Sequence, residues 1–152
     1  MATYVLISCV SKKRKLKKGE TIEARLLYDS PLFHKAWAYS EALNPDRIFI
    51  LSAKYGIIDP DTKIPYYNET LVGKPVAERK AWTEDVLAKF RDKFGYNKDE
   101  DEVIILAGEA YYKYLIGKGR IERYTLPYKG CKGIGYILSF LNKEIARLSA
   151  NE

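Results

Sequence analysis

The sequence is poor in the residues that build metal centres and disulfide frameworks. Its 152 residues include two cysteines, Cys9 and Cys131, and one histidine, His34. Two distant cysteines form no disulfide framework, and with a single histidine they do not make a zinc site. Carboxylates alone would leave only magnesium open, and no motif in the chain supports it. We therefore expect neither a metal nor a disulfide.

Long apolar runs and nucleotide-binding motifs are also missing. No stretch is long enough to span a bilayer. The first residues, MATYVLISC, have no basic region ahead of their short apolar run, so we do not expect a signal peptide. Neither G-x-G-x-x-G nor a Walker lysine motif is present, so we expect no nucleotide cofactor. These absences favour a cytoplasmic protein with no cofactor and no membrane partner.

Positive charge is in excess and concentrated. The net charge is +6 and the pI about 9.1, which favours polyanionic partners. One segment holds a dense run of basic residues, namely Lys12, Lys13, Arg14, Lys15, Lys17 and Lys18, and the chain also has 13 tyrosines. Basic side chains can bind phosphates, and tyrosine rings can stack on bases. This combination suits a protein that binds single-stranded nucleic acid or flipped bases. Heat adaptation is the alternative explanation for a chain rich in lysine, glutamate and tyrosine.

The hydrophobic pattern predicts a single α/β domain over residues 1–152. Apolar runs at 3–8, 47–51 and 102–107 predict buried parallel strands, and 121–126 reads as an edge strand. Helical spacing predicts helices, listed by range: 20–28, 31–43, 75–94, 109–116 and 134–148. Ser30 before Pro31 is a strong helix start. Strands alternating with helices predict a three-layer α/β/α sandwich around a mostly parallel, roughly four-stranded sheet.

In such a sheet, ligands bind beyond the carboxyl ends of the strands. Residues 8–13, 52–71 and 108–112 follow predicted strands, so we expect these three segments to converge. The long loop over 51–71 would then form one wall of a ligand pocket. The alternative is an ordered surface connection whose tyrosines cover the edge of the sheet.

Carboxylates in these segments are candidate catalytic groups. Cleavage of a glycosidic or N-glycosidic bond develops positive charge on the sugar, which a carboxylate can stabilise. Asp59 and Glu69 from the long loop and Glu109 from the third segment are the candidates. Asp59-Pro60-Asp61 could equally be an ordinary turn.

Other residues of the same loop are candidate ligand contacts. Tyr55, Tyr66 and Tyr67 could stack on a base, and Lys54 could meet a phosphate or a base carbonyl. Alternatively, these tyrosines pack against the protein with their hydroxyls in water.

The first and third segments leave similar alternatives. Lys12 and Lys13 could hold phosphate, although a solvated basic loop also explains them. Cys9 could be a nucleophile with His34 as its base, or a small core residue. Gly108 would let a ligand approach the backbone, and the amides of the helix start after it could bind an anion.

Four stretches of the chain resemble a small microbial and phage domain family of unassigned function. They are LISCVSKK, ARLLYDSPLF, FILSAKYGIIDPDTKIPYYNETL and VIILAGEAYYKYL, and they span most of the chain. The pattern joins Ser-Cys-x-x-Lys-Lys, Leu-Tyr-x-Ser-x-x-Phe, Leu-Ser-Ala-Lys-Tyr-Gly and a Gly-x-x-Tyr turn. Its matched positions also include Tyr28, Ser30, Phe33 and Thr70.

That family is distantly similar to uracil-DNA-glycosylase-like α/β proteins, including domains fused to archaeal tRNA-modifying proteins. The resemblance implies recognition of a modified or damaged base, in DNA more than RNA, and cleavage of its N-glycosidic bond. The positions it indicates for substrate binding are Ser8, Cys9, Lys12, Lys13, Ser52, Lys54, Tyr55, Gly56, Tyr66, Gly108 and Tyr112. The water-activating motif and late histidine motif of uracil glycosylases are absent, so a non-catalytic nucleic-acid or nucleotide-binding module is the alternative.

Overall fold

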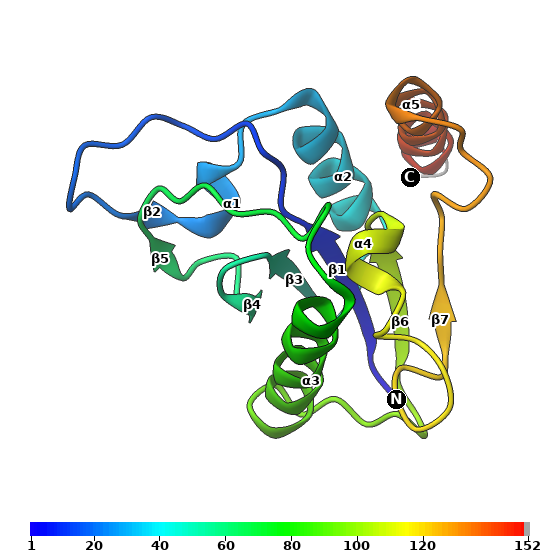
Figure 1. The fold of residues 1–152 in the computed structure, drawn as a ribbon. Helices are drawn as coiled ribbons and strands as arrows, with labels where there is room; N and C mark the ends of the chain where they lie inside the picture. The colour runs from blue at the N-terminus through cyan, green and yellow to red at the C-terminus, as the bar shows by residue number, and fades with distance from the viewer. Residues whose placement is uncertain (151–152) are drawn as a thin grey trace.

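The structure, a computed structural model, describes residues 1–150 and is organised around one five-stranded sheet (Figure 1). Its strand order is β4-β3-β1-β6-β7. The parallel strands are β1 (Thr3–Ser8), β3 (Arg47–Ser52), β6 (Glu102–Leu106) and β7 (Tyr124–Thr125). Strand β4 (Gly56–Ile58) runs antiparallel to β3, and β2 (Ile22–Glu23) pairs with β5 (Lys63–Ile64) in a small separate sheet. The mixed α/β class and the mostly parallel sheet are confirmed.

The prediction of about four strands missed β4. The chain reverses directly after β3, where Gly56 has a φ of +74°, a conformation that glycine adopts without strain. Ile57 and Ile58 then lie buried against β3. Their apolar run is too short to stand out in a loop that also contains proline, glycine and charge.

The helices are α1 (Ala24–Leu27), α2 (Pro31–Ala42), α3 (Val76–Asp92), α4 (Glu109–Tyr112) and α5 (Ile134–Ala150). The start of α2 is confirmed, because the Ser30 hydroxyl accepts a hydrogen bond from the backbone N–H of Phe33 at 3.1 Å. The helix predicted over 20–28 forms only as the short α1, since Ile22 and Glu23 pair with β5 instead. The helix predicted over 109–116 is only the single turn α4. Within residues 1–150, no helix is both long enough and apolar enough to cross a membrane.

Helices α3 and α2 contact residues from opposite faces of β1. Tyr4 packs edge-on against Phe90 of α3, with ring centroids 5.2 Å apart. Ile7, on the other face because strand side chains alternate, lines a small cavity with Phe33 and Ala36 of α2. Helix α5 packs in turn on α2. This places α2 and α3, which connect the three central strands, on different sides of β1.

The Ser30 cap gives a direct test of how α2 begins. Ser30→Ala should lower the free energy of unfolding by about 1 kcal/mol, because the N–H of Phe33 loses its acceptor. Urea denaturation followed by circular dichroism measures this. Ser139→Ala, at an exposed position of α5, is the matched control and should stay within about 0.5 kcal/mol of the parent. Equal stability of the parent and the Ser30→Ala variant would contradict the role of the cap.

Candidate site at the carboxyl edge of the sheet

The ends of β1 and β6 meet at the carboxyl edge of the sheet. The Sγ of Cys9, just past β1, lies 3.4 Å from the hydroxyl of Tyr111 in α4, the turn that follows β6. The chain goes from β1 to β3 on one side and later to β6 on the other, so the strand order reverses between β1 and β6. Ligand sites of open α/β sheets lie at such reversals. The contact between Cys9 and Tyr111 spans this position.

Ser52, the last residue of β3, joins several segments at this edge. Its hydroxyl donates a hydrogen bond to the Tyr67 hydroxyl at 2.9 Å and accepts from the N–H groups of Lys54 and Tyr55. Its carbonyl accepts from the indole N–H of Trp82 in α3 at 2.8 Å. The side chain is fully buried. Ser52 thus holds the turn after β3, the loop around Tyr67 and α3 together.

Two tyrosines and a lysine complete the group. The hydroxyls of Tyr28 and Tyr67 lie 2.5 Å apart, and the Lys13 ammonium lies 4.6 Å from the centre of the Tyr67 ring. Burial raises the pKa values of Tyr28, Tyr67 and Tyr111, so all three are neutral hydroxyls at physiological pH. Burial also lowers the pKa of Lys13, while the negative charge of a Cys9 thiolate would raise it.

We call these residues the carboxyl-edge cluster: Cys9, Lys13, Tyr28, Ser52, Tyr67 and Tyr111. It offers neutral hydroxyls, a thiol and one ammonium group. Most of it is closed over by packing, since Cys9 and Tyr111 are each 8% exposed and Tyr67 is 4% exposed. Lys13, half-buried, connects the cluster to the exposed basic segment of residues 12–18.

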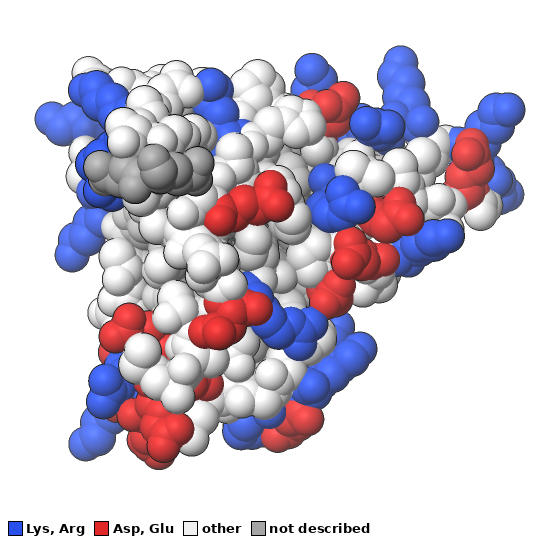
Figure 2. All heavy atoms as spheres, turned by 180° about the vertical axis from the view of Figure 1, so that it is seen from behind, with Lys and Arg blue, Asp and Glu red and all other residues white. Residues whose placement is uncertain are grey.

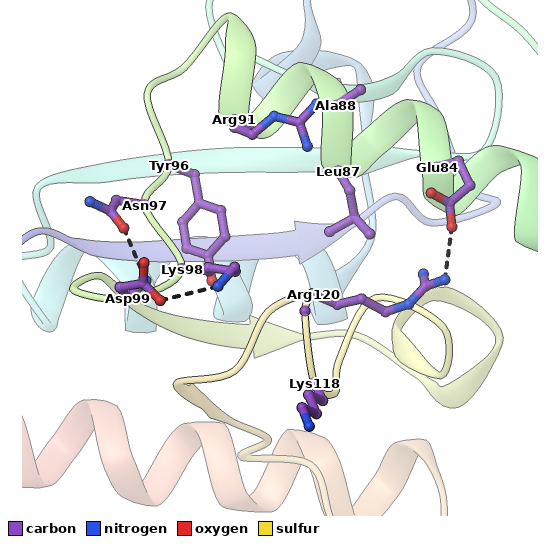
Figure 3. A pocket seen from close by; sticks show the side chains of 11 residues that line it. Glu84, Leu87, Ala88, Arg91, Tyr96, Asn97, Lys98, Asp99, Lys118 and Arg120 are labelled. Carbon is purple, nitrogen blue, oxygen red and sulfur yellow. Dashed lines mark hydrogen bonds and ion pairs between the residues drawn. The ribbon is translucent and has the colours of Figure 1, made fainter.

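A cavity lies at the opposite, amino edge of the sheet (Figure 3). It has a volume of about 630 Å³ and is formed by α3 and the loops that precede β6 and β7. Three of its four basic side chains have carboxylate partners: Arg120 bonds Glu84 at 2.8 Å, Arg91 bonds Asp92 at 2.8 Å, and Lys98 bonds Asp99 at 3.1 Å. Carboxylates therefore balance much of the positive charge in this cavity.

A second cavity, of about 470 Å³, also lies at the amino edge and is lined by Asp59. A carboxylate oxygen of Asp59 lies 2.6 Å from the guanidinium of Arg47, the first residue of β3. Asp59 lies at this edge because antiparallel β4 carries the chain back from Ser52 toward the start of β3. The structure therefore separates Asp59 from the carboxyl-edge cluster, and Asp61 beside it pairs with Arg25.

The other two candidate carboxylates are exposed at the carboxyl edge. Glu69 precedes Thr70, whose side chain lies against the Tyr111 hydroxyl. Glu109 begins α4 directly after β6 and lies 3.8 Å from Lys113. Neither carboxylate contacts the buried hydroxyls of the cluster.

The remaining predicted contact residues differ in exposure. Lys12, Lys54, Tyr66 and Gly108 are exposed; Ser8, Tyr55 and Tyr112 are half-buried; Gly56 is buried beneath Val86.

The structure bears on two of the chemical alternatives: Cys9 as a nucleophile with His34 as its base, and anion binding by the amides after Gly108. His34 bonds Asp29 at 2.9 Å and lowers the pKa of that carboxyl, whereas the Cys9 sulfur contacts Tyr111. The N–H groups of Tyr111 and Tyr112 both donate to the Gly108 carbonyl, which leaves the amides of Glu109 and Ala110 as those at the start of α4 without an acceptor in residues 1–150.

The sequence-based prediction did not include Tyr111 or Trp82, and it named Tyr67 only as a ring that could stack on a base. Tyr67 stands beside Tyr66, and no periodicity in the loop shows which of the two points inward. Trp82 fits the apolar face of α3, so its helical spacing gave no sign that the indole N–H bonds Ser52. Tyr111 could be placed only from the fold, through the strand reversal beside it.

Residues 4–143 match the model of DUF6884, a protein family of unknown function. The uncharacterized protein YfjM of Bacillus subtilis (strain 168) is 30% identical over 125 residues, which cover 82% of this chain and 81% of that protein. No solved structure matches the chain.

The hydrogen bonds of Tyr67 can be tested against its neighbour. Tyr67→Phe should lower the free energy of unfolding by about 1–3 kcal/mol, because buried Ser52 and Tyr28 lose a hydroxyl partner. Tyr66→Phe makes the same chemical change on a side chain that is 48% exposed, and should change stability by less than about 0.5 kcal/mol. Urea denaturation compares the two, and equal losses would rule out a special role for Tyr67.

Proposed function

The chain belongs to the DUF6884 family of unknown function, and we propose that it binds single-stranded nucleic acid along the carboxyl edge of its sheet. One observation carries the proposal: an exposed basic segment leads directly into a cluster of tyrosines at the strand reversal. Lys13 makes the connection, with its ammonium over the Tyr67 ring. Phosphate contacts from lysine and arginine provide most of the affinity of such proteins, and aromatic rings add stacking on bases.

The basic segment is well placed for phosphates. Its side chains from Lys12 to Lys18, apart from Lys13 and Leu16, are exposed. Among residues 1–150, no carboxylate lies within ion-pair distance of any lysine or arginine in this segment. Figure 2 shows basic side chains over the projecting lobe that contains the segment, with a few acidic groups among them. An unpaired basic surface of this kind favours a polyanion over a small neutral ligand.

Aromatic groups accompany the charges. Tyr66 is exposed beside buried Tyr67, and Tyr55 packs edge-on against Tyr67 with ring centroids 5.5 Å apart. The Lys54 ammonium lies 5.4 Å from the Tyr55 ring. Tyr66 thus offers an accessible ring for a base, on a loop that the hydrogen bonds of Tyr67 hold in place.

Salt dependence provides the test. Fluorescence anisotropy should show that an oligonucleotide binds with an affinity that falls as salt rises, because released counterions drive binding. Lys15→Gln with Lys17→Gln should make the slope of log K against log salt shallower by about 1.4, at about 0.7 per lost contact. Lys93→Gln with Lys143→Gln removes the same charge from the residue after α3 and from α5, and should leave the slope unchanged. Binding without salt dependence, or equal losses in the two double variants, would contradict the proposal.

Removal of a modified base from DNA is a second candidate function. Glu69 and Glu109 favour it, because both are exposed carboxylates at the same edge as the basic segment and Tyr66. One of them could stabilise the sugar cation or position water while Tyr55 and Tyr66 hold the flipped base. The resemblance to uracil-DNA-glycosylase-like proteins supports the same reaction.

The position of Asp59 gives this candidate a matched control. Glu69→Gln or Glu109→Gln should reduce release of free base from modified DNA by about 100-fold or more. Asp59→Asn should keep the activity, because Asp59 lies with Arg47 at the amino edge. Chromatography of the released base measures the rates, and thermal melting checks that each variant is folded. Full activity in both glutamine variants, or no base released by the parent from a panel of modified DNAs, would rule the reaction out.

A further inference from the structure

Three basic side chains surround one tyrosine ring beside the carboxyl-edge cluster. The Arg79 guanidinium and the Lys80 ammonium, both near the start of α3, each lie 5.4 Å from the centre of the Tyr114 ring. The ammonium of Lys113, the residue after α4, lies 5.6 Å from the same centre. We call these four residues the Tyr114 cluster.

The positive charge of the Tyr114 cluster is poorly balanced. Among residues 1–150, neither Arg79 nor Lys80 has a carboxylate within ion-pair distance, and Lys113 has only Glu109 at 3.8 Å. The Nε of Arg79 is buried and has no hydrogen-bond acceptor in this part of the chain. Positive charges held close together repel one another, and the attraction of each cation to the tyrosine ring offsets only part of this repulsion. An anion bound here would balance the charges and accept hydrogen bonds from the terminal N–H groups of the Arg79 guanidinium.

Helix α3 and the residues after α4 place this group close to the carboxyl-edge cluster. Trp82 lies one helical turn after Arg79, donates to the Ser52 carbonyl and packs edge-on against Tyr111 at 5.7 Å. Tyr111 in turn lies three residues before Tyr114. Contacts therefore lead from Lys13 through Tyr67 and Ser52 to Trp82 and Tyr111, which lie three residues from Arg79 and Tyr114 of the Tyr114 cluster.

We propose that the Tyr114 cluster is a phosphate-binding subsite, with Arg79 as its hydrogen-bond donor and Lys80 and Lys113 as its neutralising charges. Guanidinium groups suit this role because their planar donors match phosphate oxygens. The phosphate belongs to the backbone of the bound strand, an assignment that rests on the proposed function. A strand would then contact two basic groups, the segment 12–18 and the Tyr114 cluster, with the loop of Tyr66 between them.

Inorganic phosphate tests the subsite independently of nucleic acid. In the full chain labelled with ¹⁵N, added phosphate should shift the Arg79 Nε–H signal and saturate. Lys80→Gln with Lys113→Gln should weaken the phosphate affinity at least tenfold. Lys93→Gln with Lys143→Gln removes the same charge elsewhere and should leave it unchanged. Both pairs change exposed lysines, so both variants should fold.

The oligonucleotide measurement separates this inference from the proposed function. The subsite contacts the strand if phosphate binds at Arg79 and the slope of log K against log salt is shallower by about 1.4 in the Lys80/Lys113 double variant. If phosphate binds at Arg79 but no oligonucleotide binds, the subsite holds for a free phosphate group and the proposed function fails. If phosphate does not shift Arg79, or shifts it equally in both double variants, the subsite is wrong even where the basic segment binds a strand.

Discussion

The hydrogen bonds of Ser52 are the constraint on which the carboxyl edge depends. One buried residue satisfies two backbone N–H groups of the following turn, one tyrosine hydroxyl and one indole N–H. These partners come from three segments: the turn after β3, the loop around Tyr67 and helix α3. Because buried polar groups without partners are costly, loss of any one contact would disturb the others. The positions of Tyr55, Tyr67 and α3 are therefore linked through the end of β3.

This constraint gives a structural role to most residues of the stretch Leu-Ser-Ala-Lys-Tyr-Gly. Ser52 caps the turn, Tyr55 packs on Tyr67, and Gly56 adopts a positive φ where a β-carbon would lie 3.4 Å from Val86. Lys54 is the one exposed residue of the stretch. Most of the stretch thus builds the scaffold of the edge, while the exposed charges and rings around it are available to a ligand.

The sequence was informative wherever local pattern determined the structure. Buried apolar runs predicted β1, β3 and β6, and Ser30 before Pro31 predicted the start of α2. Topology then predicted that segments distant in sequence converge, and Cys9 does contact Tyr111.

Local sequence pattern could not predict the structure that depends on pairing between segments distant in the chain. The pairing of residues 22–23 with β5 and the return of β4 along β3 both depend on partners elsewhere in the chain. The second of these placed Asp59 at the amino edge. Tyr66 and Tyr67 show the same limit for side chains, since adjacent identical residues differ only in which way the folded loop turns them.

The central position of β1 has a consequence for how the chain folds. On one side β1 pairs with β3, but on the other it pairs with β6, so that Thr3 meets Glu102. Contacts between residues so far apart in sequence form slowly, because a long stretch of chain must first be brought together. During synthesis one flank of β1 stays unpaired until β6 leaves the ribosome. An open apolar strand is prone to pair with other chains, so the interval before β6 arrives is the stage at which we expect this chain to be exposed to aggregation.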